Sequence, residues 1–309
     1  MKSRKKRILW IAAMTGVLLL TAGCGQPAGN ETDGKEGGSS QSGTDSKEGS
    51  SSQSVADGKE GGSSQSEITF EKEHFAGESP EDKKEFRYTY EYDVLKITIP
   101  GREEVQERIQ KELDEYVESF LASVDNGSFG RVWEDEEPLE ESYMKLYADV
   151  IRADDKVISL MFGNEGYDGG VHGWYTTVYF NYFAETGERI TFEKLGDGFR
   201  EKAEELVLQK AGEVQARENI LFDGYENSIP LVVEDGTENL QEVYERVFGD
   251  WADAGGGVPQ PSFFVTDTGF VFVSGQYVLQ PYAAGIVTFE IPAEEFGDAC
   301  RADIFELQK

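Results

Sequence analysis

The side chains able to carry chemistry in this chain are few, and two of them lie four residues apart. The 309 residues include two histidines, His74 and His172, and two cysteines, Cys24 and Cys300. Asp168 precedes His172, and a carboxylate at that spacing could orient the imidazole as a general base. No nucleophile motif such as Gly-x-Ser-x-Gly accompanies the pair, and two scattered histidines provide fewer ligands than a zinc site needs. We therefore expect no catalytic residue, no metal and no cofactor, with a weak hydrolase acting through Asp168 and His172 as the alternative.

The glycines around His172 favour a structural role for its ring. Gly169, Gly170 and Gly173 permit a tight loop with positive φ. An imidazole has two nitrogens with which it can tie such a loop by hydrogen bonds. We expect a buried hydrogen bond of this kind, so that His172 stabilises the loop.

Aromatic side chains follow this loop and recur towards the C-terminus. Trp174 and Tyr175 come directly after it, and Tyr277 and Tyr282 lie in the last part of the chain. Such rings can stack on sugars or anchor a protein partner, but strands are also enriched in aromatic residues. The sequence leaves both roles open, with core packing as the simpler one.

The first 24 residues have the layout of a secretion signal. Five cations lie within residues 2–7, and residues 8–20 form an apolar run that is too short to span a membrane but suits the centre of a signal peptide. Ala22 and Gly23 directly before Cys24 resemble a bacterial lipobox. That resemblance implies that residues 1–23 are removed and that Cys24 receives a diacylglycerol, which anchors the protein to the outer face of the cell membrane, most simply in a Gram-positive envelope. An uncleaved anchor is the alternative.

Residues 24–66 are expected to form a disordered tether. Ten glycines and eleven serines lie within residues 25–66, and the ten residues 33–42 recur unchanged at 57–66, with a near copy at 45–54. The repeat has no apolar residues to bury, so it cannot form a core. A flexible coil of this length spans roughly 35 to 40 Å on average, enough to lift a folded part off the membrane.

The folded part of the chain is strongly acidic. The whole chain carries a net charge of −31, and residues 67–309, with 53 acidic and 21 basic side chains, carry −32. This balance argues against a nucleic-acid partner and favours cationic ones. With Cys24 lipidated, Cys300 is the one remaining thiol, so no internal disulfide can form. We expect Cys300 to be a buried or half-buried apolar residue.

The pattern of apolar residues predicts an α+β fold, with antiparallel sheets of hairpins and a meander and two or three packed helices. A small strand-helix companion domain is expected over 67–140 and an α+β domain over 141–309. Acidic residues on the outer face of the first helix form either a solvated surface or a docking strip for a basic partner. Strands are predicted at 86–100, 142–152, 156–162, 174–183 and 188–192, a closing meander over 263–291, and helices at 102–124, 194–217 and 239–248.

Residues 167–173, Tyr-Asp-Gly-Gly-Val-His-Gly, resemble the Gly-Gly-Ala-His signature of the RsiV-like extracytoplasmic domain. This domain is the lysozyme-binding outer region of an anti-sigma factor, and it also occurs in peptidoglycan deacetylases of the PdaC type. Stretches within 181–192, 266–272 and 281–292 agree with the same family in order. The strand and helix over 86–124 resemble, more loosely, the smaller domain that precedes it there.

The resemblance implies a protein ligand such as a basic, lysozyme-like wall hydrolase. The chain has only seven residues before its apolar run and ends at Lys309, so we expect neither the sigma-binding part nor the deacetylase part. The predicted function is a lipid-anchored, extracytoplasmic binding or sensing module without catalytic activity. A peptidoglycan-binding accessory module and a structural envelope lipoprotein are the alternatives. The candidate ligand-binding residues are Tyr167, Asp168, Gly169, Gly170, His172, Trp174, Tyr277 and Tyr282.

Overall fold

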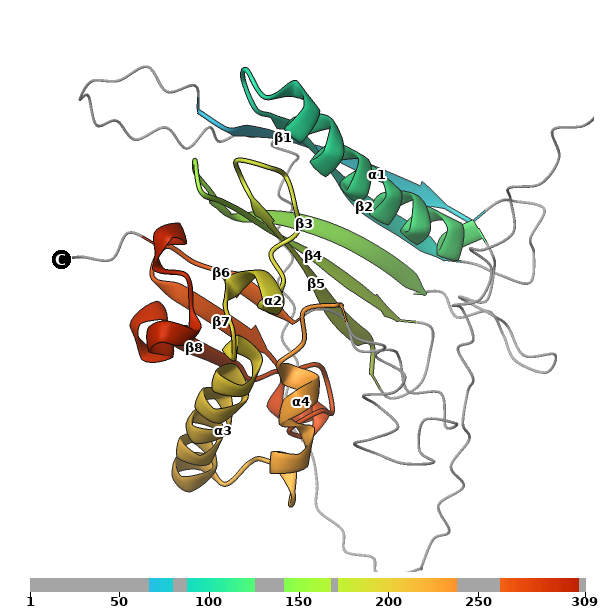
Figure 1. Ribbon diagram of the computed structural model, residues 1–309. Helices are drawn as coiled ribbons and strands as arrows, with labels where there is room; N and C mark the ends of the chain where they lie inside the picture. The colour runs from blue at the N-terminus through green and yellow to red at the C-terminus, as the bar shows by residue number, and fades with distance from the viewer. Residues whose placement is uncertain (1–66, 80–87, 126–141, 168–171, 238–261, 306–309) are drawn as a thin grey trace, which may run out of the picture. The chain divides into compact units, whose positions relative to one another are not determined.

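The computed structural model describes residues 67–79, 88–125, 142–167, 172–237 and 262–305. All of them belong to one compact unit of the chain. The fold is α+β, as the sequence predicts, with two sheets and several helices (Figure 1). Within these ranges no helix has both the length and the apolar character needed to cross a membrane. The predictions that lie outside the described residues are those for the signal peptide over 1–23, Cys24, the tether, Asp168, Gly169, Gly170 and the helix at 239–248.

The larger sheet has five strands in chain order. Neighbouring strands run antiparallel except β2 and β3, which pair in parallel over a short stretch from Thr89 and Tyr143 to Tyr92 and Leu146. This sheet therefore crosses the boundary expected near residue 140, and the division into two domains stays a prediction. The strands are β1 Thr69–Glu78, β2 Thr89–Thr98, β3 Tyr143–Ala153, β4 Val157–Tyr167 and β5 Trp174–Phe183.

Helix α1, Glu103–Asp125, lies against this sheet (Figure 1). Ile109, Leu113 and Val117 are spaced by one turn and are buried, so that one side of the helix is apolar throughout. The acidic residues of the other side are only partly free. Asp114 pairs with Lys96 at 3.4 Å, and such local pairs reduce the charge that α1 offers to a partner.

Two glutamines of α1 cover the backbone edge of β2 beyond its short pairing with β3. The side chain of Gln110 accepts a hydrogen bond from the N–H of Ile97 at 3.0 Å and donates one to the carbonyl of Leu95 at 2.9 Å. The side chain of Gln106 accepts from the N–H of Ile99 at 2.9 Å. An uncovered edge would be open to pairing with another chain, so the helix both packs on β2 and blocks it.

The smaller sheet has three antiparallel strands in the order β6, β7, β8. One face of it meets α3 through phenylalanines: the ring of Phe199 lies 4.9 Å from Phe270 and 4.6 Å from Phe296. These three rings belong to the hydrophobic core of the C-terminal half. The strands are β6 Phe263–Val265, β7 Gly269–Val273 and β8 Thr288–Pro292, and the helices are α2 Phe192–Leu195, α3 Phe199–Glu218 and α4 Ile229–Val232, with short 3-10 turns at Tyr225–Ser228, Tyr282–Ala284, Ala293–Ala299 and Ala302–Ile304.

A buried polar pair joins the two sheets. The side chain of Asn181 in β5 donates to the carbonyl of Phe263 in β6 at 2.9 Å and accepts from the N–H of Val265 at 3.3 Å. Ser159 in β4 donates its hydroxyl proton to the same amide oxygen at 2.7 Å. Because all these groups are buried, each hydrogen bond replaces one that water would otherwise make.

Several predicted elements appear as expected. The hairpin of β3 and β4, the helix over 102–124 and the β6 to β7 turn are confirmed. Cys300 is half-buried against the C-terminal core, and burial, followed by the nearby Asp303, raises the pKa of its thiol to about 12. A thiol of that kind is an apolar packing group and not a nucleophile.

Other elements differ from the prediction. Residues 188–192 form only a single bridge, Arg189 to Tyr182, before α2 begins. The helix expected from 194 begins at Phe199. The non-helical backbone of Gly196 ends α2 after Leu195, and Gly198, in a left-handed conformation with φ 75°, precedes α3. Residues 277–279, which were predicted as a strand, do not form one. Strand β1 was not predicted, because most of its residues are exposed and so show no alternation of apolar and polar residues.

Candidate functional site

His172, Tyr277 and Tyr282 form one cluster, called here the aromatic cluster. The His172 ring stacks on Tyr282 with 3.8 Å between centroids and an interplanar angle of 11°. Its Nε2 lies 2.8 Å from the Tyr277 hydroxyl oxygen, and its Nδ1 lies 2.8 Å from the carbonyl oxygen of Gly173. The carbonyl can only accept, so Nδ1 carries a proton, and in the neutral ring Nε2 accepts from Tyr277. The cluster thus joins the start of β5 to the segment between β7 and β8.

The burial expected for His172 is wrong. Its ring is exposed, as are both of its hydrogen bonds. The hydrogen bonds that tie the loop are present, but water can replace them, so each contributes less than a buried one. His172 lies at the surface because the residues it contacts come from the exposed loop after β7.

Tyr277 has an unusual backbone. Its φ of 61° is in the left-handed region, which is rare for a residue with a large side chain, and 51% of its surface is exposed. Such a conformation costs on the order of 1 to 3 kcal/mol and persists only where the surroundings enforce it. The fold holds a large ring out into solvent at an energetic cost, which is typical of functional surfaces.

Hydrogen bonds on both sides fix the loop that carries Tyr277. The side-chain oxygen of Gln276 accepts from the N–H of Tyr175 in β5 at 3.0 Å. Ser274 and Val287 exchange two hydrogen bonds across the base of the loop, at 2.8 and 2.9 Å. Gln280 closes the far end by donating to the carbonyl of Ala284 at 2.9 Å. The ring of Tyr277 is therefore held in place before any partner arrives.

The aromatic surface continues along the larger sheet. Tyr175, which is hydrogen-bonded to Gln276, stacks with Tyr147 of β3 at 6.3 Å and 15°. A side chain at Gly163 of β4 would lie 2.1 Å from the Tyr147 ring, so glycine leaves room for that ring to lie flat on the sheet. Burial, and then the Tyr175 hydroxyl, raise the pKa of Tyr147, which keeps its hydroxyl neutral.

The structure separates the other candidate residues from the aromatic cluster. Trp174 is half-buried and packs on the core beneath α1, with its ring over Gly166. Tyr167 is half-buried at the end of β4, opposite Tyr143. Since neighbours in a strand face opposite sides of a sheet, the Tyr175 ring lies on the side opposite to Trp174 and to the core beneath α1. The alternation of side chains along a strand could have shown, from the sequence alone, that Trp174 and Tyr175 lie on opposite sides of the sheet.

The predicted pairing of Asp168 with His172 lies outside the described residues. Among the residues that the structure describes, no group of three or more His, Cys, Asp or Glu is arranged to hold a metal ion. Both ring nitrogens of His172 have hydrogen-bond partners in the loop. The described geometry therefore gives this ring a positioning role.

Residues 215–294 match the family model DUF3298, a protein of unknown function. The matched segment includes β6, β7, β8 and the loop with Tyr277 and Tyr282. No curated protein matches the chain.

Two solved structures are similar to this chain. One is a DUF3298 family protein from Pseudomonas aeruginosa PAO1, with 13% identity and a TM-score of 0.49, covering 77% of this chain and 96% of that one. The other is a member of the same family from Bacteroides fragilis NCTC 9343, with 15% identity and a TM-score of 0.48, covering 74% of this chain and 92% of that one.

Proposed function

We propose that this protein is a lipid-anchored, extracytoplasmic binding module, and that the aromatic cluster contacts a cationic protein such as a lysozyme-like wall hydrolase. The observation that carries the proposal is Tyr277, a half-exposed ring in a strained conformation, fixed from two sides. Tyrosine is enriched among the residues that dominate binding energy at protein interfaces. Fixing such a ring in advance removes part of the entropy that binding would otherwise cost.

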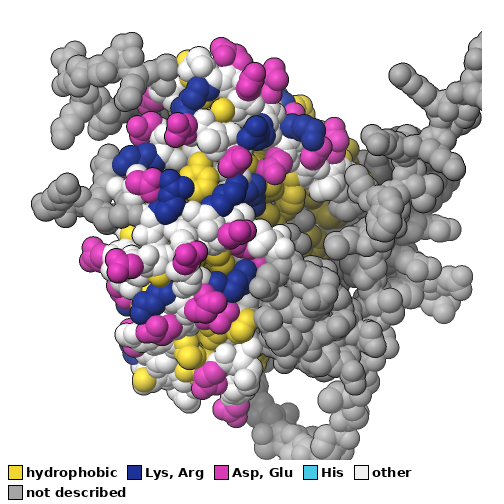
Figure 2. All heavy atoms as spheres, viewed as in Figure 1, with side chains coloured by type: hydrophobic (Ala, Val, Ile, Leu, Met, Phe, Trp, Pro, Cys, Tyr) yellow, Lys and Arg dark blue, Asp and Glu magenta, His cyan; other side chains and the backbone are white. Residues whose placement is uncertain are grey.

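The charge of residues 67–309 supports a basic partner. A net charge of −32 attracts a cationic protein over a distance set by ionic strength and speeds encounter. Figure 2 shows Lys and Arg side chains interspersed with Asp and Glu on the face in view, so the acidity of that face is not one continuous patch. Attraction by the net charge, with the aromatic cluster providing the contact, fits both observations.

The resemblance of residues 167–173 to the RsiV-like signature supports the same class of ligand. The lipid anchor is supported by the lipobox-like residues before Cys24. The hydrolase alternative has less support, because both ring nitrogens of His172 already have partners. The glycan-binding alternative is an outcome of the test below.

The test measures binding of the full chain to a basic lysozyme by biolayer interferometry. Tyr277→Gly removes the ring and also relieves the left-handed strain, so it leaves stability unchanged or higher. We expect it to raise Kd by about 30-fold or more, the equivalent of about 2 kcal/mol. Phe75→Ala is the matched control, since Phe75 is also a partly exposed ring (41%) but lies on β1.

The expected result is weakening by Tyr277→Gly with Phe75→Ala unchanged. Equal effects of the two substitutions, or no binding to lysozyme at low salt, would contradict the proposal. Binding to purified peptidoglycan that depends on Tyr277, without binding to lysozyme, would favour the glycan-binding alternative.

A further inference from the structure

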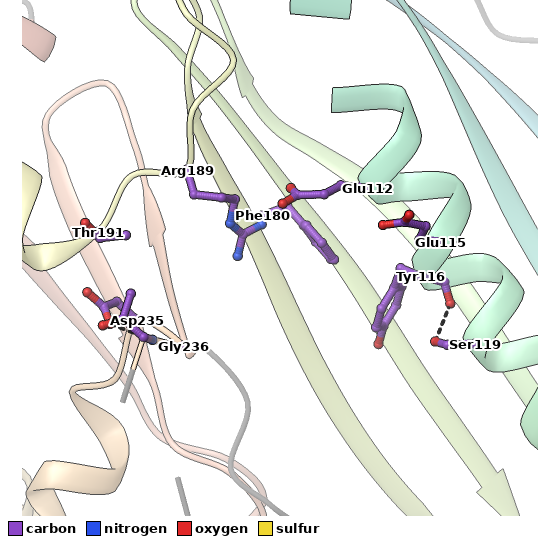
Figure 3. Close-up of a pocket in the computed structure, with 10 residues that line it drawn as sticks. Glu112, Glu115, Tyr116, Ser119, Phe180, Arg189, Thr191, Asp235 and Gly236 are labelled. Atoms are coloured by element: carbon purple, nitrogen blue, oxygen red, sulfur yellow. Dashed lines mark hydrogen bonds between the residues drawn. The ribbon is translucent and has the colours of Figure 1, made fainter. Parts of the chain in front are cut away.

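A cavity of about 460 Å³ that is largely open to solvent lies beside α1, and no residue of the aromatic cluster lines it. Its walls come from the side of α1, from Phe180 of β5, from Arg189 and Thr191, and from residues 235–237 after α4 (Figure 3). This volume is within the range of small-molecule sites in proteins.

The walls of the cavity are fixed by hydrogen bonds. Arg102, directly before α1, and Arg108 of α1 donate to the carbonyls of Ala184 and Thr186 at 2.6 and 2.9 Å, and so tie the helix to the turn after β5. On the other side, the carboxylate of Asp235 accepts from the N–H of Phe192 at 2.6 Å. The site is therefore formed without a ligand.

Arg189 lines this cavity with a guanidinium that lacks, within the described residues, an acceptor for one of its nitrogens. Its guanidinium lies over the rings of Phe180 and Tyr182, at 4.6 and 5.3 Å, and Nη2 donates to the carbonyl of Tyr179 at 3.1 Å. Its Nη1 is buried and has no hydrogen-bond partner among the residues that the structure describes. Within those residues no carboxylate forms an ion pair with it, although residues 67–309 carry a net charge of −32. The guanidinium interacts instead with the side chain of Tyr182, whose hydroxyl donates to Glu112. A buried donor without an acceptor is costly, so it indicates a group that the ligand supplies.

A second donor stands next to Arg189. Thr191 occupies the position before α2, where a threonine hydroxyl usually caps the helix, but its side chain makes no capping hydrogen bond. A guanidinium and a hydroxyl on one wall match the two oxygens of a carboxylate. Figure 3 places both residues on the side of the cavity opposite α1.

The wall formed by α1 has the opposite charge. Glu112 and Glu115 line it, and Glu112 is held in place by the hydroxyl of Tyr182, which donates to it at 2.6 Å. Between the two walls, Tyr116 and Phe180 meet edge to face at 5.3 Å and give an apolar surface. Asp235 also lines the cavity on the side of Thr191, but Arg200 at 3.5 Å, the N–H of Phe192 and the side chain of Thr237 already engage its carboxylate. The cavity thus offers a cation, an apolar floor and the carboxylates of α1.

We propose that this cavity binds a free amino acid or a short peptide. The ligand carboxylate meets Arg189 and Thr191, its apolar part lies on Tyr116 and Phe180, and its ammonium meets Glu115. A zwitterion matches both charged walls, whereas a simple anion would be repelled by α1 and a neutral sugar would leave the guanidinium without a counter-charge.

The test screens the full chain by saturation-transfer NMR against the twenty free amino acids and a set of dipeptides. For each binder, the carboxamide and the N-acetyl derivative are compared with the parent compound. We expect at least one zwitterion to bind, and both derivatives to bind at least about tenfold more weakly, because each removes one charged contact.

Two substitutions connect the binding to the cavity. Arg189→Met removes the charge while keeping an unbranched apolar stem. Glu115→Gln changes an exposed carboxylate whose ion pair with Lys111, at 2.9 Å, lies at the surface, where a ligand ammonium can replace it. Each should weaken binding about tenfold or more, and Glu118→Gln on the same helix is the control that should not. Should Arg189→Met fail to fold, as judged by circular dichroism, Glu115→Gln alone decides. No binder in the panel, equal binding of the derivatives, or insensitivity to Glu115→Gln would overturn the proposal.

Discussion

Replacing Arg152 with methionine is expected to destabilise the fold more than any surface change. Only 3% of the Arg152 side chain is exposed, and its guanidinium joins three segments of the chain. Its Nε donates to Asp154 at 2.6 Å, Nη1 to the carbonyl of Thr266 at 2.7 Å, and Nη2 to the carbonyl of Ile304 at 2.7 Å. The end of β3, the turn between β6 and β7, and the C-terminal turn therefore depend on one side chain.

The magnitude follows from what methionine leaves behind. The methionine side chain fills the space of the arginine stem, so little apolar contact is lost. The carbonyls of Thr266 and Ile304 lose their donor, which costs about 1 to 3 kcal/mol for each buried acceptor. Asp154 is 37% exposed and can be rehydrated, so its contribution is small. The two carbonyls together therefore cost about 2 to 6 kcal/mol, a range that includes the cost of other broken buried charge contacts.

Urea unfolding followed by circular dichroism measures this loss. The slope of the free energy of unfolding against urea concentration should be the same in the variant and the wild type. Arg217→Met is the matched control, because Arg217 is 66% exposed and its one ion pair among the described residues is with its neighbour Glu218. Its removal should change the free energy of unfolding by less than about 0.5 kcal/mol. Arg152→Lys keeps the charge but not the three-way geometry and should lie between the two. A loss below about 1 kcal/mol in Arg152→Met would refute the reasoning.

Four further predictions concern other parts of the chain. His172→Ala should lower the free energy of unfolding by less than about 1 kcal/mol in a urea titration, because its hydrogen bonds are exposed; a loss of 3 kcal/mol would mean that the loop is a buried structural element. Burial raises the pKa of Glu234, so the carboxyl keeps its proton to higher pH in the folded state than in the unfolded state. The contribution of Glu234 to stability should therefore fall as the pH rises from the ordinary glutamate pKa of 4.5 through the pKa in the folded state. Glu234→Gln should flatten that part of the urea midpoint profile between pH 4 and 8, and an unchanged profile would contradict the assignment. Gly269→Ala should prevent close pairing of β7 with β8, since the added carbon would lie 2.2 Å from the carbonyl oxygen of Ile291, and a thermal melt should show a loss of at least about 1 to 3 kcal/mol. Cys24→Ala should abolish incorporation of labelled palmitate and release the protein from the membrane fraction, whereas a wild-type protein without label would exclude the lipid anchor.

The sequence by itself determined the elements whose pattern is local. Helix α1 was predicted over 102–124 and spans Glu103–Asp125, because its apolar residues recur once per turn and pack on one side, where they are buried or half-buried. The β3 and β4 hairpin was predicted for the same kind of reason, an alternation interrupted by Ala-Asp-Asp. β1 was not, because an exposed edge strand does not need an apolar face.

Only the tertiary structure decided which distant residues meet. The sequence placed His172, Tyr277 and Tyr282 in one candidate set, but also Tyr167 and Trp174, which the sheet turns elsewhere. The left-handed backbone of Tyr277 has no local signal, because it is enforced by hydrogen bonds to the loop around it from β5 and from Val287, directly before β8. Arg189 likewise gave no sign in the sequence, since an unpaired guanidinium is recognised only when every neighbour has been placed. Local periodicity fixes which side of an element is buried, whereas a site depends on contacts between residues a hundred positions apart, which arise only when the elements pack.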